Sequence, residues 1–214
     1  MNPRPRSELV ARELLCSLVR LLVGAVPANG VSTTTAQAIF FANHSSHLDT
    51  VVLLAALPLR WRMRVRPVAA MDYWGNGRIR RWIAERVLNV VFINRHGKVG
   101  EDALAPVRQA LQEGASLIFF PEGTRHNGAL PDEFKSGIFR LAEEFPRIAL
   151  VPTYLENPNR TLPKGSLLVL PLINRVHFGA ALSRIAEESK PAFLTRARQA
   201  VCELAPHQFS SSPK

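Results

Sequence analysis

Short apolar runs alternate with amphipathic segments along most of the chain. Short runs of β-branched or aromatic residues are typical of buried strands, whereas apolar residues spaced by three and four indicate helices. From residue 36 onward the two patterns alternate, which predicts an α/β fold: a single domain with a central mixed, largely parallel sheet flanked by helices. Strands are expected at 38–42, 65–70, 88–93, 116–120 and 148–155, with one or two more in 167–178, and helices at 50–57, 79–86, 101–113, 136–145 and 191–204.

The segment before residue 36 has a pattern of its own. Leucines recur at helical spacing between Ser7, a candidate N-cap, and Val26, and Arg12 and Arg20 interrupt the apolar run. The run is too short for a membrane span of roughly 20 residues, and Arg20 also disfavours a signal peptide. Two interpretations stay open: an amphipathic helix lying in the plane of a membrane surface, or a helix packed on the domain.

The net charge of the chain limits the kinds of molecule that it is expected to bind. The 214 residues include 27 Lys and Arg against 17 Asp and Glu, a net charge of +10, which implies an anionic partner. Nucleic acid is disfavoured, because no binding motif accompanies the charge and aromatic residues are few. We therefore expect a basic amphipathic membrane-contact segment (1–35), one globular domain (36–205) and a disordered tail (206–214). Cys16 and Cys202 have no spaced partner that would indicate a disulfide framework or a metal site.

Three polar clusters follow directly on strand-like runs. They read NHSSHLD from Asn43, NRHG from Asn94 and PEGTRHNG from Pro121. In open α/β sheets, ligands bind beyond the carboxyl ends of the strands. The sequence therefore predicts that these clusters contribute to one site.

The first cluster holds a candidate imidazole–carboxylate pair. His44 and Asp49 would lie about 140° apart on a helix, so they can meet only if Ser45 and Ser46 form a turn. Asp49 could then accept a hydrogen bond from one ring nitrogen and leave the other free to take a proton. The alternative is a helix cap beside a histidine that fills a loop. A metal site formed with His47 is disfavoured, because the remaining histidines show no ligand spacing.

The other two clusters carry residues suited to binding an anion. Arg95, placed just after a strand, could hold a phosphate with two hydrogen bonds. Gly123 allows a ligand to approach the backbone, and Thr124 and Arg125 offer donors. Glu122 could orient a hydroxyl or hold Arg125. The alternatives are a salt-bridged surface arginine and a tight turn that contains a salt bridge.

Together these clusters resemble the sequence blocks of the glycerolipid acyltransferase family, whose bacterial prototype is 1-acyl-sn-glycerol-3-phosphate acyltransferase. Asn43–Asp49 is similar to the family's His-x4-Asp signature, and Phe120–Arg125 to its Phe-Pro-Glu-Gly-Thr-Arg block. Further resemblance lies in Phe92–Arg95, Phe134–Gly137, Leu150–Thr153 and Leu162–Gly165. There are two departures: Asn89 replaces a usual glycine, a mild change because Asn tolerates positive φ, and His126 replaces a usual serine.

The resemblance implies an acyltransferase of the 1-acylglycerol-3-phosphate O-acyltransferase type. It would move a fatty acyl group from acyl-CoA or acyl-carrier protein to the free hydroxyl of a lysophospholipid. The acceptor that the resemblance favours is 1-acyl-sn-glycerol-3-phosphate, whose acylation gives phosphatidate. His44 and Asp49 would be catalytic. No metal or cofactor is expected, since the thioester is a co-substrate. The residues that would bind the acceptor are Arg95, Glu122, Gly123, Thr124 and Arg125.

The expected partners are a lysophospholipid, an acyl thioester, an anionic membrane surface and, where it is the donor, acyl-carrier protein; nucleic acid is not expected. The expected location is the cytoplasmic face of a membrane, as a peripheral or monotopic protein. The chain has no Gly-x-Ser-x-Gly motif, so no covalent acyl-enzyme is expected. Two alternatives remain: another lysolipid or amino-lipid acceptor, and a thioesterase or other hydrolase.

Overall fold

A computed structural model of the protein describes residues 5–32, 36–71, 77–94, 102–126, 128, 130–156 and 173–206. The strands are β1 (Ala25–Pro27), β2 (Ala38–Ala42), β3 (Val65–Ala70), β4 (Val91–Ile93), β5 (Ser116–Phe119), β6 (Ala149–Leu155) and β7 (Asn174–Phe178). The helices are α1 (Arg6–Val23), α2 (Asp49–Ala56), α3 (Leu59–Arg62), α5 (Arg78–Trp82), the π-helix η1 (Ile83–Val87), α6 (Ala105–Gln112), α7 (Gly137–Glu144) and α9 (Lys190–Cys202).

The strands of these residues form one seven-stranded sheet in the order β1-β7-β6-β2-β5-β3-β4. Neighbouring strands are parallel, except that β6 and β7 are antiparallel. The central strands β2, β5 and β6 are buried along their whole length, as expected for continuous apolar runs in a parallel sheet covered on both faces. The predicted α/β fold with a mixed, largely parallel sheet is confirmed.

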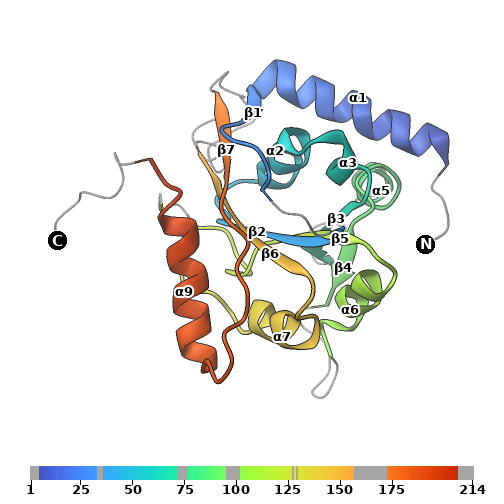
Figure 1. The fold of residues 1–214 in the computed structure, drawn as a ribbon. Helices are drawn as coiled ribbons and strands as arrows, with labels where there is room; N and C mark the ends of the chain where they lie inside the picture. The colour runs from blue at the N-terminus through green and yellow to red at the C-terminus, as the bar shows by residue number, and fades with distance from the viewer. Residues whose placement is uncertain are drawn as a thin grey trace.

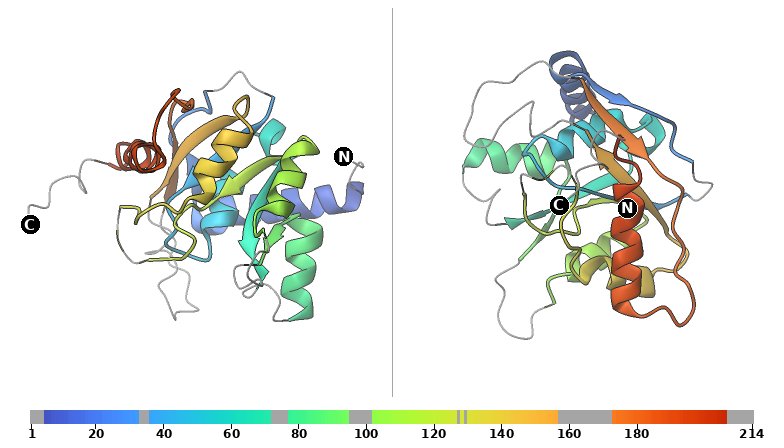
Figure 2. Two further views of the ribbon diagram at one scale, coloured as in Figure 1. Left: turned by 90° about the horizontal axis from the view of Figure 1, so that it is seen from below. Right: turned by 90° about the vertical axis from the view of Figure 1, so that its left-hand side faces the viewer.

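Helices cover both faces of the sheet (Figure 1). The helices α1, α2, α3 and α5 lie on one side, and α6, α7 and α9 lie on the other; the side view in Figure 2 shows the sheet between them. Successive residues of a strand point to opposite faces, so Phe40 packs in one core with Leu53, and Phe41 packs in the other with Ile138. Burial of each such side chain contributes about 1.5–3 kcal/mol.

Helix α1 packs on α2. Its inner face buries Cys16 and Arg12, whose Nη2 donates to the carbonyl of Val65 at 2.7 Å. Its outer face exposes Leu14, Leu18, Leu21 and Leu22. The helix begins after Pro5 and Ser7 makes no cap, so the predicted N-cap was wrong. None of the helices in the described ranges combines the length and apolar character that a membrane span requires.

Other elements depart from the sequence-based expectation in length or kind. Strand β4 begins at Val91 rather than residue 88, because Asn89 has a φ of 54°, which interrupts extended backbone. The expected helix at 79–86 is α5 followed by η1. Strand β1 was not expected, and it pairs with β7. Of the last expected strand region, 167–172 lies outside the described residues, as do 207–214 of the expected tail.

Candidate active site

The carboxyl ends of β2, β3, β4 and β5 meet at one edge of the sheet because these strands run parallel. A cavity of about 350 Å³ opens at this edge. It brings the first and third polar clusters together, as the sequence predicted. The cavity is lined by His44, His47, Thr50, Val68, Ala69, Ala70, Ile93, Leu104, Phe119, Phe120, Pro121, Gly123, Arg125, Lys135 and Gly137.

His44 and Asp49 form the expected pair across a turn. Nδ1 of His44 lies 2.8 Å from Oδ2 of Asp49, the fully buried first residue of α2. The same oxygen accepts the amides of Ser45 at 2.7 Å and Ser46 at 2.8 Å, so the turn is built around the carboxylate. A carboxylate can only accept, so Nδ1 of His44 carries the proton and the neutral ring has its lone pair on Nε2.

The imidazole of His44 is held on the cavity side. Its ring stacks on Phe120 with centroids 4.2 Å apart and planes 18° apart, and its side chain is 21 % exposed. Over the part of the chain that the structure describes, Nε2 of His44 makes no hydrogen bond, while the ring lines the cavity. This nitrogen is therefore positioned to take a proton from a bound ligand.

Glu122, in the third polar cluster, connects this cluster to His44 in the first. Its side chain is buried; Oε1 accepts the amide of His44 at 2.7 Å and Oε2 accepts the amide of Asp132 at 2.9 Å. His126 Nε2 lies 2.6 Å from Oε2. Burial raises the pKa of Glu122, against the opposing effects of the Asp132 amide, His126 and the His44 amide. The carboxylate of Glu122 thus binds the loop that contains His44 (residues 43–48, called the His44 loop) rather than Arg125, the partner that the sequence suggested.

Cationic side chains lie at the same cavity. Arg125 and Lys135 both line it. Gly123 has a φ of 71°, and a Cβ at this position would lie 3.1 Å from Nζ of Lys135, so glycine serves both the turn and the lysine. Thr124 is exposed beside Arg125. Arg95, the remaining predicted phosphate ligand, lies outside the described residues.

Two basic residues of the lining, Lys135 and His47, were not predicted from sequence to act in the reaction. Lys135 belongs to a segment that resembled the family without indicating a function, and His47 was considered only as a metal ligand. Burial, followed by the charge of Arg125, lowers the pKa of His47. Among the described residues, no group of three or more His, Cys, Asp or Glu side chains is arranged to hold a metal ion.

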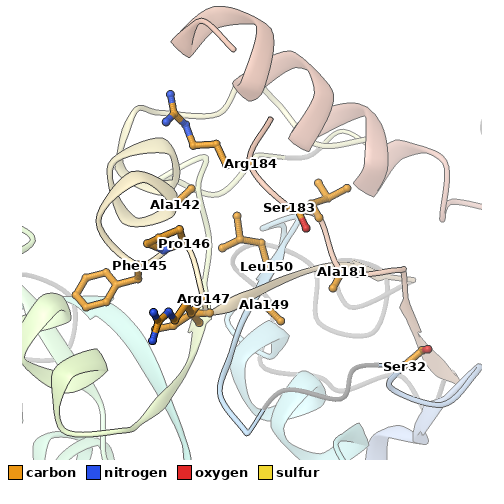
Figure 3. A pocket seen from close by; sticks show the side chains of 12 residues that line it. Ser32, Ala142, Phe145, Pro146, Arg147, Ala149, Leu150, Ala181, Ser183 and Arg184 are labelled. Carbon is orange, nitrogen blue, oxygen red and sulfur yellow. The ribbon is translucent and has the colours of Figure 1, made fainter. Parts of the chain in front are cut away.

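A second cavity, of about 340 Å³, lies at the opposite edge of the sheet (Figure 3). Ala149 and Leu150 at the start of β6 contribute to its lining, together with Arg147 and Arg184. None of the predicted site residues within the described ranges lines it. Of the predicted site residues that the structure describes, His44, Gly123 and Arg125 line the cavity at the carboxyl edge instead.

Comparison with known proteins identifies the family. The Acyltransferase family model matches residues 26–156. The chloroplastic 1-acyl-sn-glycerol-3-phosphate acyltransferase LPAT1 of Arabidopsis thaliana is 30% identical over 130 residues, which are 60% of this chain and 34% of that protein. A probable 1-acyl-sn-glycerol-3-phosphate acyltransferase of Mycoplasma pneumoniae is 29% identical over 109 residues, 47% of this chain and 38% of that protein. The matches thus span less than half the length of these curated relatives.

The fold also has a counterpart among solved structures. The 1-acyl-sn-glycerophosphate (LPA) acyltransferase PlsC from Thermotoga maritima superposes with a TM-score of 0.76 and 18% sequence identity, over 100% of this chain and 86% of that one. At this identity the likeness concerns the fold. The family model spans more than half of the sequence and includes the His44–Asp49 turn and the Glu122 turn, and so this chain belongs to the Acyltransferase family.

Proposed function

We propose that the protein transfers a fatty acyl group from acyl-CoA or acyl-carrier protein to the free hydroxyl of 1-acyl-sn-glycerol-3-phosphate, giving phosphatidate. The observation that carries the proposal is the 2.8 Å contact between Nδ1 of His44 and the buried carboxylate of Asp49, at a cavity that also presents Arg125 and Lys135. The names of the matched relatives support the choice of acceptor.

His44 acts as the general base in this mechanism. Its Nε2 takes the proton of the acceptor hydroxyl while the oxygen attacks the thioester carbonyl, so that a C–O bond forms and the C–S bond then breaks. The departing thiolate takes the proton back from the imidazolium. Asp49 stabilises the imidazolium between these two steps and keeps the ring in the required tautomer. Because both substrates are bound side by side, positioning supplies much of the rate gain.

The acceptor phosphate binds where the cations lie. Arg125 and Lys135 supply positive charge from the lining, and Gly123 gives the ligand access to the backbone. Thr124, Arg95 and the turn held by Glu122 complete this part of the proposed site. The apolar side of the cavity suits an acyl chain, since Val68, Ile93, Leu104 and Phe119 contribute to it.

The test is thiol release from long-chain acyl-CoA, with and without lysophosphatidate. Release by the wild type should depend on the acceptor and should be lost in His44→Ala. His177→Ala is the matched control, because His177 on β7 contacts Glu156, the residue after β6, and does not line the cavity. Acceptor-independent release would favour a hydrolase. A lysolipid panel would identify a different acceptor, and release unchanged in His44→Ala would refute the mechanism.

We also propose that the protein works on the cytoplasmic face of a membrane, as a peripheral or monotopic protein. The outer face of α1 presents its leucines to solvent, and α5 buries none of its residues. Ile79 and Trp82 of α5 are exposed among three arginines. Tryptophan favours the membrane–water interface, and arginine is attracted to anionic lipids. The free thiols of Cys16 and Cys202 fit a reducing compartment.

Vesicle sedimentation tests this placement. Leu22 on α1 and Ile185, which precedes α9 on the other face of the sheet, are both 56% exposed. Leu22→Glu should weaken binding to vesicles containing anionic phospholipid, because it places a carboxylate in the proposed contact, whereas Ile185→Glu should bind like the wild type. Equal loss in both variants, or in neither, would argue against α1 as the contact.

A further inference from the structure

His126 is linked to His44 in two ways, directly through its backbone and indirectly through Glu122. Its backbone amide donates to the carbonyl of His44 at 3.2 Å. Its ring nitrogen Nε2 lies 2.6 Å from Oε2 of Glu122, and the other oxygen of that carboxylate holds the amide of His44. The side chain of His126 and the backbone of His44 therefore meet at the same carboxylate.

The tautomer of His126 is set by its other ring nitrogen. Nδ1 accepts the amide of Gly128 at 3.0 Å, so in the neutral ring the proton resides on Nε2, which faces Glu122. Nε2 is shielded from solvent and forms no hydrogen bond of good geometry with another described atom. Its interaction with the Glu122 carboxylate is therefore mainly electrostatic.

Gly128 leaves space for this arrangement. A Cβ at position 128 would lie 3.0 Å from Nδ1 and 3.3 Å from Cε1 of His126. A larger residue there would push the ring away from the position in which it meets Glu122. Gly128 thus allows the His126 ring to stay in contact with the Glu122 carboxylate.

We propose that His126 is a positioning residue, which acts through Glu122 to hold the backbone of His44, and with it the imidazole, at the cavity. The inference rests on the proposed function, because it assigns His44 the role of base. The path is short: His126 Nε2 to Oε2 of Glu122, and Oε1 of Glu122 to the amide of His44.

The charge state of Glu122 gives this coupling a measurable signature. Burial raises the pKa of Glu122; the groups that oppose the rise are the amide of Asp132, His126, and the amide and ring of His44. Among the described residues, Cys202 of α9 also senses this carboxylate, and its own pKa is raised mainly by burial. Removal of the His126 ring should therefore move the protonation of Glu122 to higher pH and loosen the His44 amide at a pH where the wild type holds it.

Two variants of similar shape distinguish the roles of the two ring nitrogens of His126. His126→Gln places an amide nitrogen near the position of Nε2 and can still donate to Glu122. His126→Asn reaches only the position of Nδ1 and can still accept from Gly128. His177→Asn is the matched control, as it alters a histidine that contacts a different glutamate, Glu156, at 3.3 Å.

Acceptor-dependent thiol release is measured for each variant from pH 5.5 to 9. We expect kcat of His126→Asn to fall about tenfold, because the electrostatic contact between the ring nitrogen and the buried Glu122 carboxylate is lost. The KM values of both substrates should change by less than about twofold, because no group that binds substrate is removed. The acid limb of the kcat profile should move to higher pH in His126→Asn and stay near the wild-type position in His126→Gln. Equal losses in both variants, or full activity in His126→Asn, would overturn the proposal.

The NMR shift of the His44 amide proton provides a readout independent of activity. As the pH falls, this resonance should report the loss of charge on Glu122, with a higher midpoint in His126→Asn than in the wild type. An unchanged midpoint would refute the coupling. If the wild type shows no acceptor-dependent release, the proposed function fails, and the NMR midpoint alone then decides whether His126 holds the His44 backbone.

Discussion

Asp49→Asn tests the central pair with little change in shape. In the wild type one oxygen, Oδ2, accepts from His44 Nδ1 and from the amides of Ser45 and Ser46. The two serine amides require an acceptor at that position, so the asparagine oxygen should occupy it and the His44 tautomer should survive. The amide nitrogen then takes the place of Oδ1, a buried atom without a hydrogen-bond partner among the described residues. The substitution therefore removes mainly the negative charge.

The size of the effect follows from the distance between the charges. A carboxylate about 4 Å from the centre of an imidazolium contributes about 4 kcal/mol at an effective dielectric of about 20. If the imidazolium forms fully in the transition state, kcat should fall about a thousandfold. Replacing three charge-assisted hydrogen bonds by neutral ones lowers the free energy of unfolding by at most about 3 kcal/mol, since each differs by about 1 kcal/mol.

The assay is acceptor-dependent thiol release at saturating acyl-CoA, with urea unfolding on the same preparations. Asp132→Asn is the matched control, because the Asp132 side chain is exposed and, among the described residues, accepts the amide of Glu133 alone, at 3.0 Å. It should retain wild-type kcat. A folded Asp49→Asn protein with kcat within about tenfold of the wild type would refute the reasoning that Asp49 stabilises a developing imidazolium.

Three further predictions concern the same edge of the sheet. Gly123→Ala should lower the free energy of unfolding by about 1–2 kcal/mol, because the φ of Gly123 is 71°. It should also raise the KM for lysophosphatidate, because the new Cβ would lie 3.1 Å from Nζ of Lys135. An unchanged KM would contradict the role given to Lys135. Burial raises the pKa of Glu122 above its ordinary value of 4.5, so the folded state binds this proton more tightly than the unfolded state. The stability contribution of Glu122 is therefore fully present below pH 4.5 and is lost as the pH rises through the pKa of Glu122 in the folded state. In this pH range, urea unfolding should show the stability of the wild type falling relative to that of Glu122→Gln. A constant difference between the two proteins would contradict the assigned burial. Burial and the charge of Arg125 lower the pKa of His47, so its NMR titration should have a midpoint below 6.5 that rises in Arg125→Met; a wild-type midpoint above 6.5 would disprove this.

The fold could be predicted from sequence where the local pattern is strong. Residues 38–42 and 65–70 form strands with the predicted bounds. The first is a continuous apolar run, which suits a strand buried on both faces. The helix expected at 101–113 ends near its predicted C-terminus, where Gly114 has a φ of 85°. Strand β1 could not be predicted, because a three-residue strand is formed by its pairing with β7, about 150 residues away in sequence.

For the site, the sequence identified His44, Asp49 and the Glu122–Arg125 turn, because short spacings and strand ends restrict where polar side chains can lie. It suggested Arg125 as a partner of Glu122 and missed the partners that the structure shows. That carboxylate binds the amides of His44 and Asp132, which lie 78 and 10 residues away, and backbone amides leave no signature in the identity of a residue.

The sequence by itself determined the α/β class, the order of most elements and the imidazole–carboxylate pair, since each depends on contacts between residues that are close along the chain. The tertiary structure decided that Lys135 and His47 share the cavity with His44, that Glu122 braces the His44 loop, and that α1 packs on α2 with its leucines facing outward. These features depend on which segments the sheet brings together. Long-range packing sets that choice, and the spacing of residues within any one segment does not encode it.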